Sequence, residues 1–342
     1  MKVLYVGLYG EGQTSKMRGE LLKQILQPRV YDVIDTEIPQ LNGHRFFRSI
    51  AFRYKTGPLI KQINKYVVHH AGQNKYDLIW VDKAIYLTKA TTSLLRKNAA
   101  FLLHFTPDPA FQYHKSSLFR DSLPLYDMAV TTKSYELKDY HDVLSEDKVM
   151  LVTQGFDKML HRPCHLFSEK SGVVFVGHYT DDRREIIQQL IDKGTEVKLA
   201  GIYWEKFVKL NRHNNNLKYF GKGIFSEEYA KLVSSSYFGL GLLSRVVPEL
   251  HTTRTFEIPA CGTALVTERN NEITSFYKDD EVIFFNRAPE IPSLIEKYLN
   301  DKDTLRSITE KGNARALSGG FDYRSILEGI LNRANVKAYH PA

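Results

Sequence analysis

Glu249-Leu-His-Thr-Thr-Arg-Thr-Phe-Glu257-Ile-Pro-Ala-Cys-Gly262-Thr-Ala-Leu-Val-Thr267 is the most informative stretch of this 342-residue chain. The apolar turn after Glu257 ends at Gly262 and leads into a β-rich segment, which predicts a helix over residues 252–260 followed by a strand. Glu257 then lies inside the helix and Glu249 in the loop before it. Two acids placed in this way can reach two parts of one ligand.

The expected start of this helix favours an anion. The N–H groups at His251, Thr252 and Thr253 would be free of helical partners, and the helix dipole would add positive potential there. Arg254 lies in the first turn, where a cation does not help the helix but can hold a phosphate with two hydrogen bonds. The segment therefore predicts a site for a phosphorylated ligand.

The motif resembles the donor site of the GT-B glycosyltransferases, both the Glu-x7-Glu of glycosyltransferase family 4 and the Arg-x-Phe-Glu-Ile-Pro-Ala-Cys-Gly of the spore-maturation (CgeB-like) branch. By this resemblance Glu249 contacts the donor sugar and Glu257 holds the ribose hydroxyls of the nucleotide. The chain departs from family 4 at Leu250 and His251, where a Gly followed by an aromatic or aliphatic residue and Pro is usual. The alternative interpretation is a surface glutamate followed by a helix-capping one.

Length and composition favour a two-domain protein of the cytoplasm. The chain has 43% hydrophobic and 25% charged residues, which is typical of globular proteins. We find no apolar run of about 18 residues and no signal peptide. Two cysteines are too few for a disulfide framework, which fits a reducing compartment.

The net charge of +8 predicts an acidic partner. No acid occurs from Ile38 to Tyr76, and aromatic residues alternate there with cations: Arg45, Arg48, Arg53, Lys55, Lys61, Lys65 and Lys75. We expect residues 43–66 to bind an anionic membrane surface, or else to form a core-facing helix with a basic rim. Nucleic acid is not expected as a partner, because no recognition module is visible.

Strand and helix patterns alternate along both halves of the chain, with a break between residues 155 and 172. This alternation predicts an α/β protein with parallel sheets and ligands at the carboxyl ends of the strands. We expect one Rossmann-like domain over residues 1–163 and a second over 172–320. By the resemblance, the domains form a GT-B enzyme facing each other across a cleft. The helix within 321–342 would pack back on the first domain.

Further residues complete the predicted donor site. Phe175-Val-Gly177-His178 followed by Arg183 is similar to the CgeB-like branch. Gly177 would let the backbone approach a ligand, and Arg183 would help to neutralise the leaving diphosphate. The alternative is that Arg183 belongs to a solvated charge cluster with its neighbours.

The acceptor is expected in the first domain, where His104 and Asp108 lie near the end of a strand and two prolines stiffen the loop. Either residue could be the base of an inverting transfer. In a retaining transfer, which the Glu249/Glu257 spacing favours, they would position the acceptor or polarise the donor. The alternative interpretation is that neither residue has a functional role, with His104 a half-buried histidine of the strand and Asp108 a turn residue.

By resemblance, Gly10 and Gly12 form a loop that touches acceptor or diphosphate.

No metal site and no cofactor are expected. Asp301-Lys-Asp303 looks more like a helix cap than a metal motif, and His161-Arg-Pro-Cys164-His165 lacks a second ligand pair for zinc. We therefore predict a metal-independent glycosyltransferase that uses a nucleotide-sugar donor and a glycan, lipid-linked or protein acceptor. A non-catalytic nucleotide-sugar-binding module and a nucleotide-sugar epimerase are the alternatives.

Overall fold

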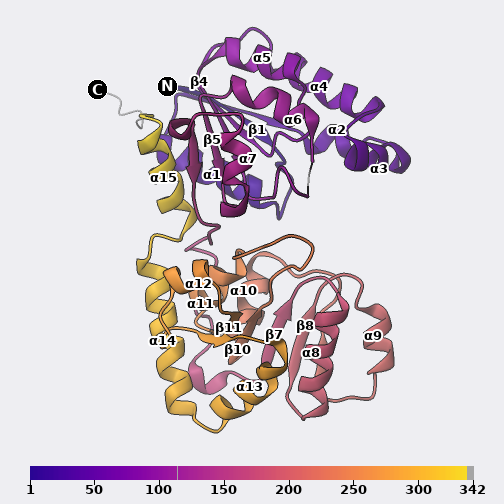
Figure 1. Cartoon of the computed structure of the whole chain (residues 1–342), viewed down its shortest axis with the longest axis vertical. Coiled ribbons are helices and arrows are strands. Elements are labelled where there is room, and N and C mark those ends of the chain that lie inside the picture. Colours follow the sequence, from indigo (N-terminus) through magenta and orange to yellow (C-terminus); the bar gives the residue numbers. More distant parts are fainter. Residues whose placement is uncertain (114, 337–342) are drawn as a thin grey trace. The chain divides into compact units, whose positions relative to one another are not determined.

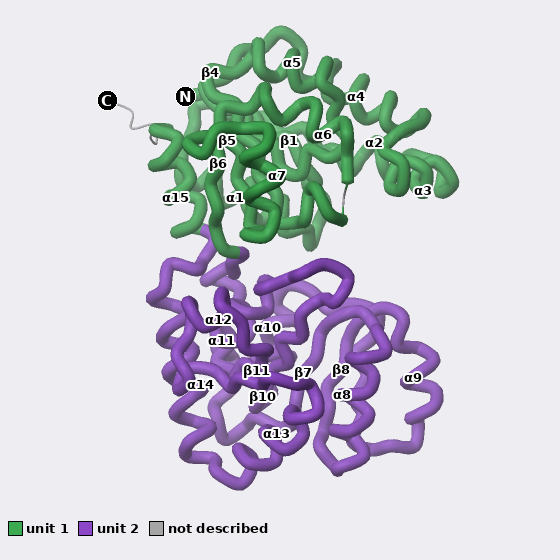
Figure 2. The backbone as a smooth tube through the Cα atoms, in the orientation of Figure 1, with its two compact units in different colours: residues 1–153, 324–342 green, residues 154–323 purple. Residues whose placement is uncertain are grey.

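Two compact units make up the chain in the computed structural model, which describes residues 1–113 and 115–336. Unit 1 comprises residues 1–153 together with the segment from Arg324 onward, and unit 2 comprises residues 154–323 (Figure 2). Each unit contains one six-stranded sheet whose strands all run parallel, with helices packed on it (Figure 1).

The sheet of unit 1 has the strand order β2-β1-β3-β4-β5-β6. Its first four strands are apolar along most of their length, as expected for a parallel sheet covered on both faces. The strands are β1 (Lys2–Gly7), β2 (Val30–Asp35), β3 (Tyr76–Asp82), β4 (Ala99–Thr106), β5 (Met128–Thr131) and β6 (Val149–Leu151). The helices are α1 (Thr14–Leu26), α2 (Glu37–Leu41), α3 (Arg45–Tyr54), α4 (Pro58–Ala71), α5 (Lys89–Asn98), α6 (Ser117–Ser122) and α7 (Leu137–His141).

The sheet of unit 2 has the strand order β12-β11-β10-β7-β8-β9. The strands are β7 (Val173–Val176), β8 (Val197–Ala200), β9 (Leu217–Tyr219), β10 (Phe238–Gly241), β11 (Ala264–Glu268) and β12 (Ile283–Phe285). The helices are α8 (Asp181–Asp192), α9 (Glu205–Leu210), α10 (Ser226–Ser234), α11 (Arg254–Ala260), α12 (Asn271–Phe276), α13 (Ile291–Leu299) and α14 (Lys302–Ser318). Helix α15 (Tyr323–Arg333) follows, and the short 3₁₀ helices are η1 (Leu123–Leu125), η2 (Ser134–Glu136), η3 (Glu146–Lys148), η4 (Phe167–Glu169) and η5 (Ala288–Glu290).

Alternate side chains of β7 in unit 2 enter different cores. Val173 and Phe175 pack in one core together with residues of α8 and α13. Val174 packs in the other, together with residues of α10, α11 and α14. This alternation is the period of two that a pleated strand imposes. On the second of these faces, α11 packs against β10 and β11.

The unit boundaries differ from the predicted domain boundaries at one point. Residues 154–163, which we assigned to the first domain, belong to unit 2. The reason is that Phe156 is fully buried in the core of unit 2 and pairs with Asp322 in an isolated parallel bridge. Loss of periodicity in the sequence therefore did not mark the boundary.

Helix α15 packs on unit 1. Arg324 donates a hydrogen bond to Gln24 at 3.1 Å, and Arg333 donates one to the carbonyl of Asp147 at 3.4 Å. Residues 337–342 of the predicted C-terminal segment lie outside the described residues. Within the described chain, no helix is both long enough and apolar enough to cross a membrane.

Candidate functional site

Each sheet has a point where the direction of strand succession reverses. In unit 2 it lies between β7 and β10, and in unit 1 between β1 and β3. In open parallel sheets the loops on either side of such a point separate, and ligands bind in the crevice outside the carboxyl ends of those strands. The two reversal points are therefore the expected positions of ligand sites, independently of any sequence motif.

Glu257 occupies the reversal point of unit 2. It lies on α11, which follows β10, and only 7% of the residue is exposed. Tyr229 of α10 donates its hydroxyl to Glu257 Oε2 at 2.9 Å, and His161 Nε2 lies 3.8 Å from Oε1. Burial, followed by the charge of Glu257, raises the pKa of Tyr229 well above its usual value, so this hydroxyl stays a donor.

Arg254 lies one turn before Glu257 on the same helix. Its Nη1 atom is 3.8 Å from Glu257 Oε2, and its guanidinium lies over the Tyr229 ring at 5.5 Å. The Arg254 side chain is 38% exposed, so a ligand can reach it from solvent while its buried side contacts Glu257. Cation, ring and carboxylate thus form one packed cluster.

The helix that carries them is shorter than predicted. It begins at Arg254 instead of residue 252. The N–H of Thr252 donates to Thr255 Oγ1 at 3.1 Å, and the N–H of Arg254 donates to Thr252 Oγ1 at 3.2 Å. The Thr253 hydroxyl accepts from Arg254 Nη1 at 3.0 Å. The prediction of freely available amides at this turn is therefore wrong for Thr252, because the Thr255 hydroxyl already accepts from its N–H.

His251 is also used within the protein. It is 4% exposed, its Nε2 accepts from the N–H of Gln154 at 3.0 Å, and its Nδ1 lies 2.5 Å from Glu272 Oε2. The donor-binding role predicted for His251 relies on its backbone N–H and stays a prediction. Its ring, with both nitrogens engaged, fastens the start of unit 2 to the loop that carries the motif.

Arg183 and Gly177 lie at the end of β7, opposite the motif. Arg183 is 6% exposed and donates to the carbonyls of His178 and Leu242 at 3.1 and 3.2 Å, so it links the loops after β7 and β10. Burial lowers the pKa of Arg183, while Glu249 is close enough to oppose this effect. Gly177 accepts a hydrogen bond from Trp204 Nε1 at 2.9 Å, and a Cβ there would lie 2.7 Å from the Phe175 ring. Packing alone thus explains this glycine.

Glu249 lies in the loop after β10 and is half-buried. It is within electrostatic range of Arg183, Arg254 and His178. Burial, followed by the Arg183 charge, lowers the pKa of His178. The structure therefore brings Glu249, Arg254 and Glu257 together with Arg183 at one end of the sheet.

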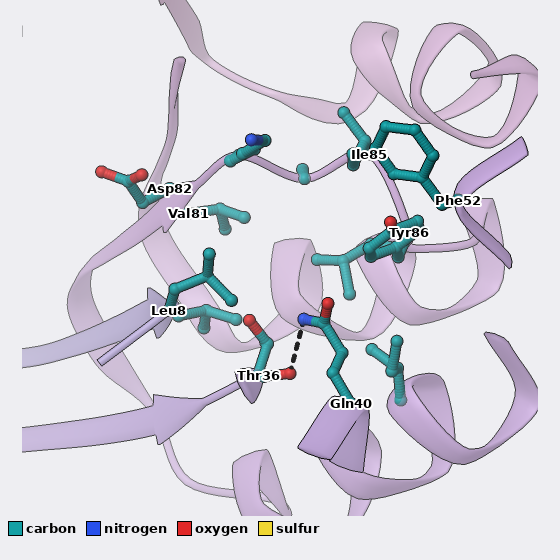
Figure 3. Close-up of a pocket in the computed structure, with 13 residues that line it drawn as sticks. Leu8, Thr36, Gln40, Phe52, Val81, Asp82, Ile85 and Tyr86 are labelled. Carbon is teal, nitrogen blue, oxygen red and sulfur yellow. Dashed lines mark hydrogen bonds between the residues drawn. The ribbon is translucent and has the colours of Figure 1, made fainter. Parts of the chain in front are cut away.

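Unit 1 has a pocket at its own reversal point. Its volume is about 210 Å³, and Leu8, Thr36 and Lys83, which directly follow the ends of β1, β2 and β3, contribute to its wall. Figure 3 shows Leu8 and Val81 on one side, Phe52, Ile85 and Tyr86 on the other, and Gln40 between them. Gln40 is held by a 2.8 Å hydrogen bond to the Thr36 carbonyl. The wall is mainly apolar.

Lys83 and Asp108 form an ion pair at the ends of β3 and β4. Lys83 has a φ of 60°, a left-handed conformation that is uncommon for a residue with a side chain. The loop carrying Asp108 is held by buried Glu136, which accepts hydrogen bonds from the N–H groups of Ala110, Phe111 and Gln112 at 2.8–2.9 Å. Asp108 is 38% exposed and is thus reachable.

His104 is not reachable. It is 1% exposed and packs against the rings of Phe119 and Tyr126. Burial lowers its pKa to about 3, so it is neutral. Because its side chain is enclosed in the core and is not exposed to solvent, the structure contradicts its prediction as a catalytic base. The alternative, a strand histidine, is correct, with burial deeper than expected.

Gly10 and Gly12 lie in the loop between β1 and α1. A Cβ at Gly10 would lie 1.9 Å from the Glu37 carboxylate, whereas one at Gly12 would meet nothing within 4 Å. Gly12 has a φ of 77°, which explains why glycine is used there. Neither is among the residues that line the described pocket.

Several residues of these sites were missed at the level of sequence: Tyr229, His161, Lys83 and Glu136. No local pattern marks Tyr229, which is 28 residues away from Glu257 and reaches it only through folding. His161 was visible only as part of a faint zinc-like cluster.

Within residues 1–113 and 115–336, no group of three or more His, Cys, Asp or Glu residues is arranged to hold a metal ion. Asp301 caps α14, as predicted, by accepting from the Thr304 N–H at 3.1 Å.

Comparison with known families finds a similarity in the second half of the chain. Residues 183–332 match the family described as glycosyl transferase-like, a segment of somewhat less than half of the chain. It contains most of α8, the whole motif from Glu249 to Thr267, and most of α15. No curated protein sequence matches the chain significantly.

Solved structures match the chain over nearly its whole length. HepE from Anabaena, solved with UDP, has a TM-score of 0.66 and 14% identity, covering 98% of this chain and 100% of that one. Sucrose-phosphate synthase from Thermosynechococcus elongatus has a TM-score of 0.69 and 14% identity, covering 98% and 99%. A glycosyltransferase from Rickettsia africae has a TM-score of 0.65 and 13% identity, covering 98% of each chain. The predicted GT-B fold is confirmed; these identities establish the fold and not the substrate.

Proposed function

We propose that this protein is a metal-independent glycosyltransferase that takes a sugar from a nucleotide diphosphate bound in unit 2. The observation that carries the proposal is the cluster of Glu257, Tyr229 and Arg254 at the reversal point of the sheet. It lies inside the segment that matches the glycosyl transferase-like family. A carboxylate held by a neutral hydroxyl on one side retains acceptor capacity for the two hydroxyls of a ribose.

The cations at the same end of the sheet suit the other half of such a donor. Departure of a nucleoside diphosphate requires stabilisation of its developing negative charge, which cations and dipoles fixed in place can supply. Arg254 is the more exposed of the two arginines and is proposed to contact the diphosphate. Arg183 is proposed to fix the loops after β7 and β10 and to add positive potential at the site.

Glu249 is proposed to contact the donor sugar. It lies in the loop directly before the cluster and within electrostatic range of both arginines. Its distance along the chain from Glu257 is that of family 4, which supports a retaining transfer. The uridine nucleotides are the first donors to test, because the HepE structures contain UDP and UDP-glucose.

The acceptor is proposed to bind at the pocket of unit 1, with Asp108 at its reactive end. Apolar walls suit the ring face of a sugar or the first part of a lipid carrier, so a glycan or lipid-linked acceptor of surface-polymer synthesis fits better than a highly charged one. Asp108, paired with Lys83, is the exposed carboxylate at the end of β4.

Nucleotide binding tests the donor half directly. UDP and UDP-glucose are expected to raise the melting temperature of the wild-type protein in a panel of nucleoside diphosphates and their sugars. Glu257→Gln keeps the shape of the side chain but removes its charge, and it should weaken UDP binding by roughly tenfold to a hundredfold. Glu310→Gln, on the exposed surface of α14, is the matched control. Equal affinities for all three proteins would contradict the proposal.

Product analysis tests the reaction. Donor hydrolysis without acceptor, or sugar transfer to one, is expected of an enzyme. Conversion of the nucleotide sugar into a stereoisomer without a second substrate would instead indicate an epimerase. Tight donor binding with no turnover against any acceptor would indicate a binding module.

A further inference from the structure

Helix α3 differs from the other helices of unit 1 in how little of it is buried. Of its ten residues, only Ala51 is buried. The following helix α4, by contrast, buries Leu59, Ile60, Ile63 and Val67 in the core. Helix α3 lies at the edge of unit 1, where α4 is its neighbour (Figure 1).

The apolar face of α3 is not covered by the rest of the protein. Phe46, Phe47, Ile50 and Tyr54 recur at helical spacing and share one face. Phe46 is 61% exposed and Tyr54 is 65% exposed. The helix is attached instead through Ala51 and through Phe52, which forms part of the pocket wall. In a helix that serves only the fold, the apolar face would be turned inward.

Cations surround this face and no acid opposes them. Arg45, Arg48 and Arg53 on α3 are exposed, as are Lys61 and Lys65 on α4. No Asp or Glu occurs anywhere from Ile38 to Tyr76. Leu41, at the end of α2, adds a further exposed apolar side chain. Aromatic and aliphatic groups framed by arginines and lysines match the interface of an anionic bilayer, where rings enter the headgroup region and cations meet lipid phosphates.

We infer that α3 is an interfacial helix that docks unit 1 on an anionic membrane surface, with Phe46 and Tyr54 entering the headgroup region. The inference does not depend on sugar transfer, because it rests on the exposure and charge of this one surface. The pocket lies directly beside the docked helix through Phe52, so docking would bring the pocket close to the lipid phase.

Vesicle flotation of the full-length protein tests the charge requirement. We expect the protein to float with vesicles containing 30% phosphatidylglycerol and to stay in solution with pure phosphatidylcholine, at low salt. The triple substitution Arg45→Gln, Arg48→Gln, Arg53→Gln should lower the partition coefficient by roughly tenfold to a hundredfold. Raising the ionic strength should also weaken binding, since salt screens these charges. Removal of three exposed cations from unit 2, by Lys206→Gln, Lys209→Gln and Arg212→Gln, is the control and should have little effect.

Insertion of the aromatic face can be measured separately. Trp80 and Trp204 are fully buried, so they contribute a constant fluorescence background. The indole introduced by Phe46→Trp should shift its emission to the blue with anionic vesicles and be quenched by lipids brominated near the headgroup.

Phe46→Ser with Tyr54→Ser should abolish flotation, whereas Leu210→Ser, at a 74% exposed position of α9, should not. Absence of flotation at low salt, or flotation unchanged by the α3 substitutions, would overturn the inference. Conversion of a dimer to a monomer by the same substitutions, without lipid binding, would overturn it in favour of self-association.

Discussion

The carboxyl ends of the two sheets differ in the side chains that they present. In unit 2 the reversal point holds charged groups that support one another: Glu257 is bonded to Tyr229 and faces Arg254. In unit 1 the reversal point opens into a mainly apolar pocket whose charged lining residues are Asp82 and Lys83, the latter paired with Asp108. A cluster arranged in advance is suited to an ionic ligand such as a diphosphate, because little reorganisation accompanies binding. An apolar pocket suits a ligand held by its shape.

Substitution at Asp108 should have the largest effect and separates the two regions most clearly. Asp108→Asn is expected to lower turnover by about a hundredfold or more, since removal of a carboxylate from the reacting end affects the chemical step. The affinity for UDP should stay unchanged, because the proposed nucleotide site is in unit 2. Steady-state kinetics together with calorimetric titration of UDP measure both quantities. Asp121→Asn, on the surface of α6, is the control, and equal turnover of the two variants would show that the acceptor chemistry lies elsewhere.

The buried imidazole of His104 should make unit 1 sensitive to acid. Burial lowers its pKa in the native state to about 3, whereas in the unfolded chain it is about 6.5. The unfolded state therefore takes up a proton as the pH falls below 6.5, and the free energy of unfolding decreases. At pH 4.5 the loss attributable to this group should be about 3 kcal/mol.

Urea denaturation at pH 7 and pH 4.5 measures this loss. His104→Gln should remove that part of the pH dependence, even though the substitution itself affects stability at both pH values. His141→Gln, which removes an exposed imidazole of α7, is the comparison. If wild type and His104→Gln lose the same stability on acidification, His104 is not the sensitive group.

The smallest expected effect concerns the support of Glu257. Tyr229→Phe removes the hydroxyl that donates to Oε2 but keeps the ring beneath Arg254. One hydrogen bond of this kind contributes about 1 kcal/mol, so the dissociation constant for UDP should rise about fivefold. Calorimetry at one pH is sufficient. A stronger loss, close to that of Glu257→Gln, would mean that Tyr229 itself contacts the nucleotide.

The regular elements were largely predictable because their signals are local. Helix α1 and strand β1 follow from periodicity over a few residues. Five short helices, α2, α6, α7, α9 and α12, were missed, since five or six residues give too little pattern to recognise. The start of α11 was also misplaced, because threonine hydroxyls compete for the amides that would begin the helix earlier.

The residues of unit 2 were easier to predict than those of unit 1 for a physical reason. Glu249, Arg254 and Glu257 are consecutive parts of one loop and helix, so their closeness in space is fixed by local geometry. The prediction for His104 required knowing which face of β4 is turned to the core. A strand buried on both faces gives no alternation in its sequence from which to decide this.

The amino-acid sequence by itself determined the alternation of strands and helices, the two Rossmann-like halves and the motif that ends one of them. These features depend on interactions between residues near one another in the chain. Only the tertiary structure decided the strand orders, and with them the two reversal points, the contact of Tyr229 with Glu257 and the ion pair of Lys83 with Asp108. It also decided that α3 turns its aromatic face away from the core. Such placements come from packing between distant segments, which no short stretch of sequence contains.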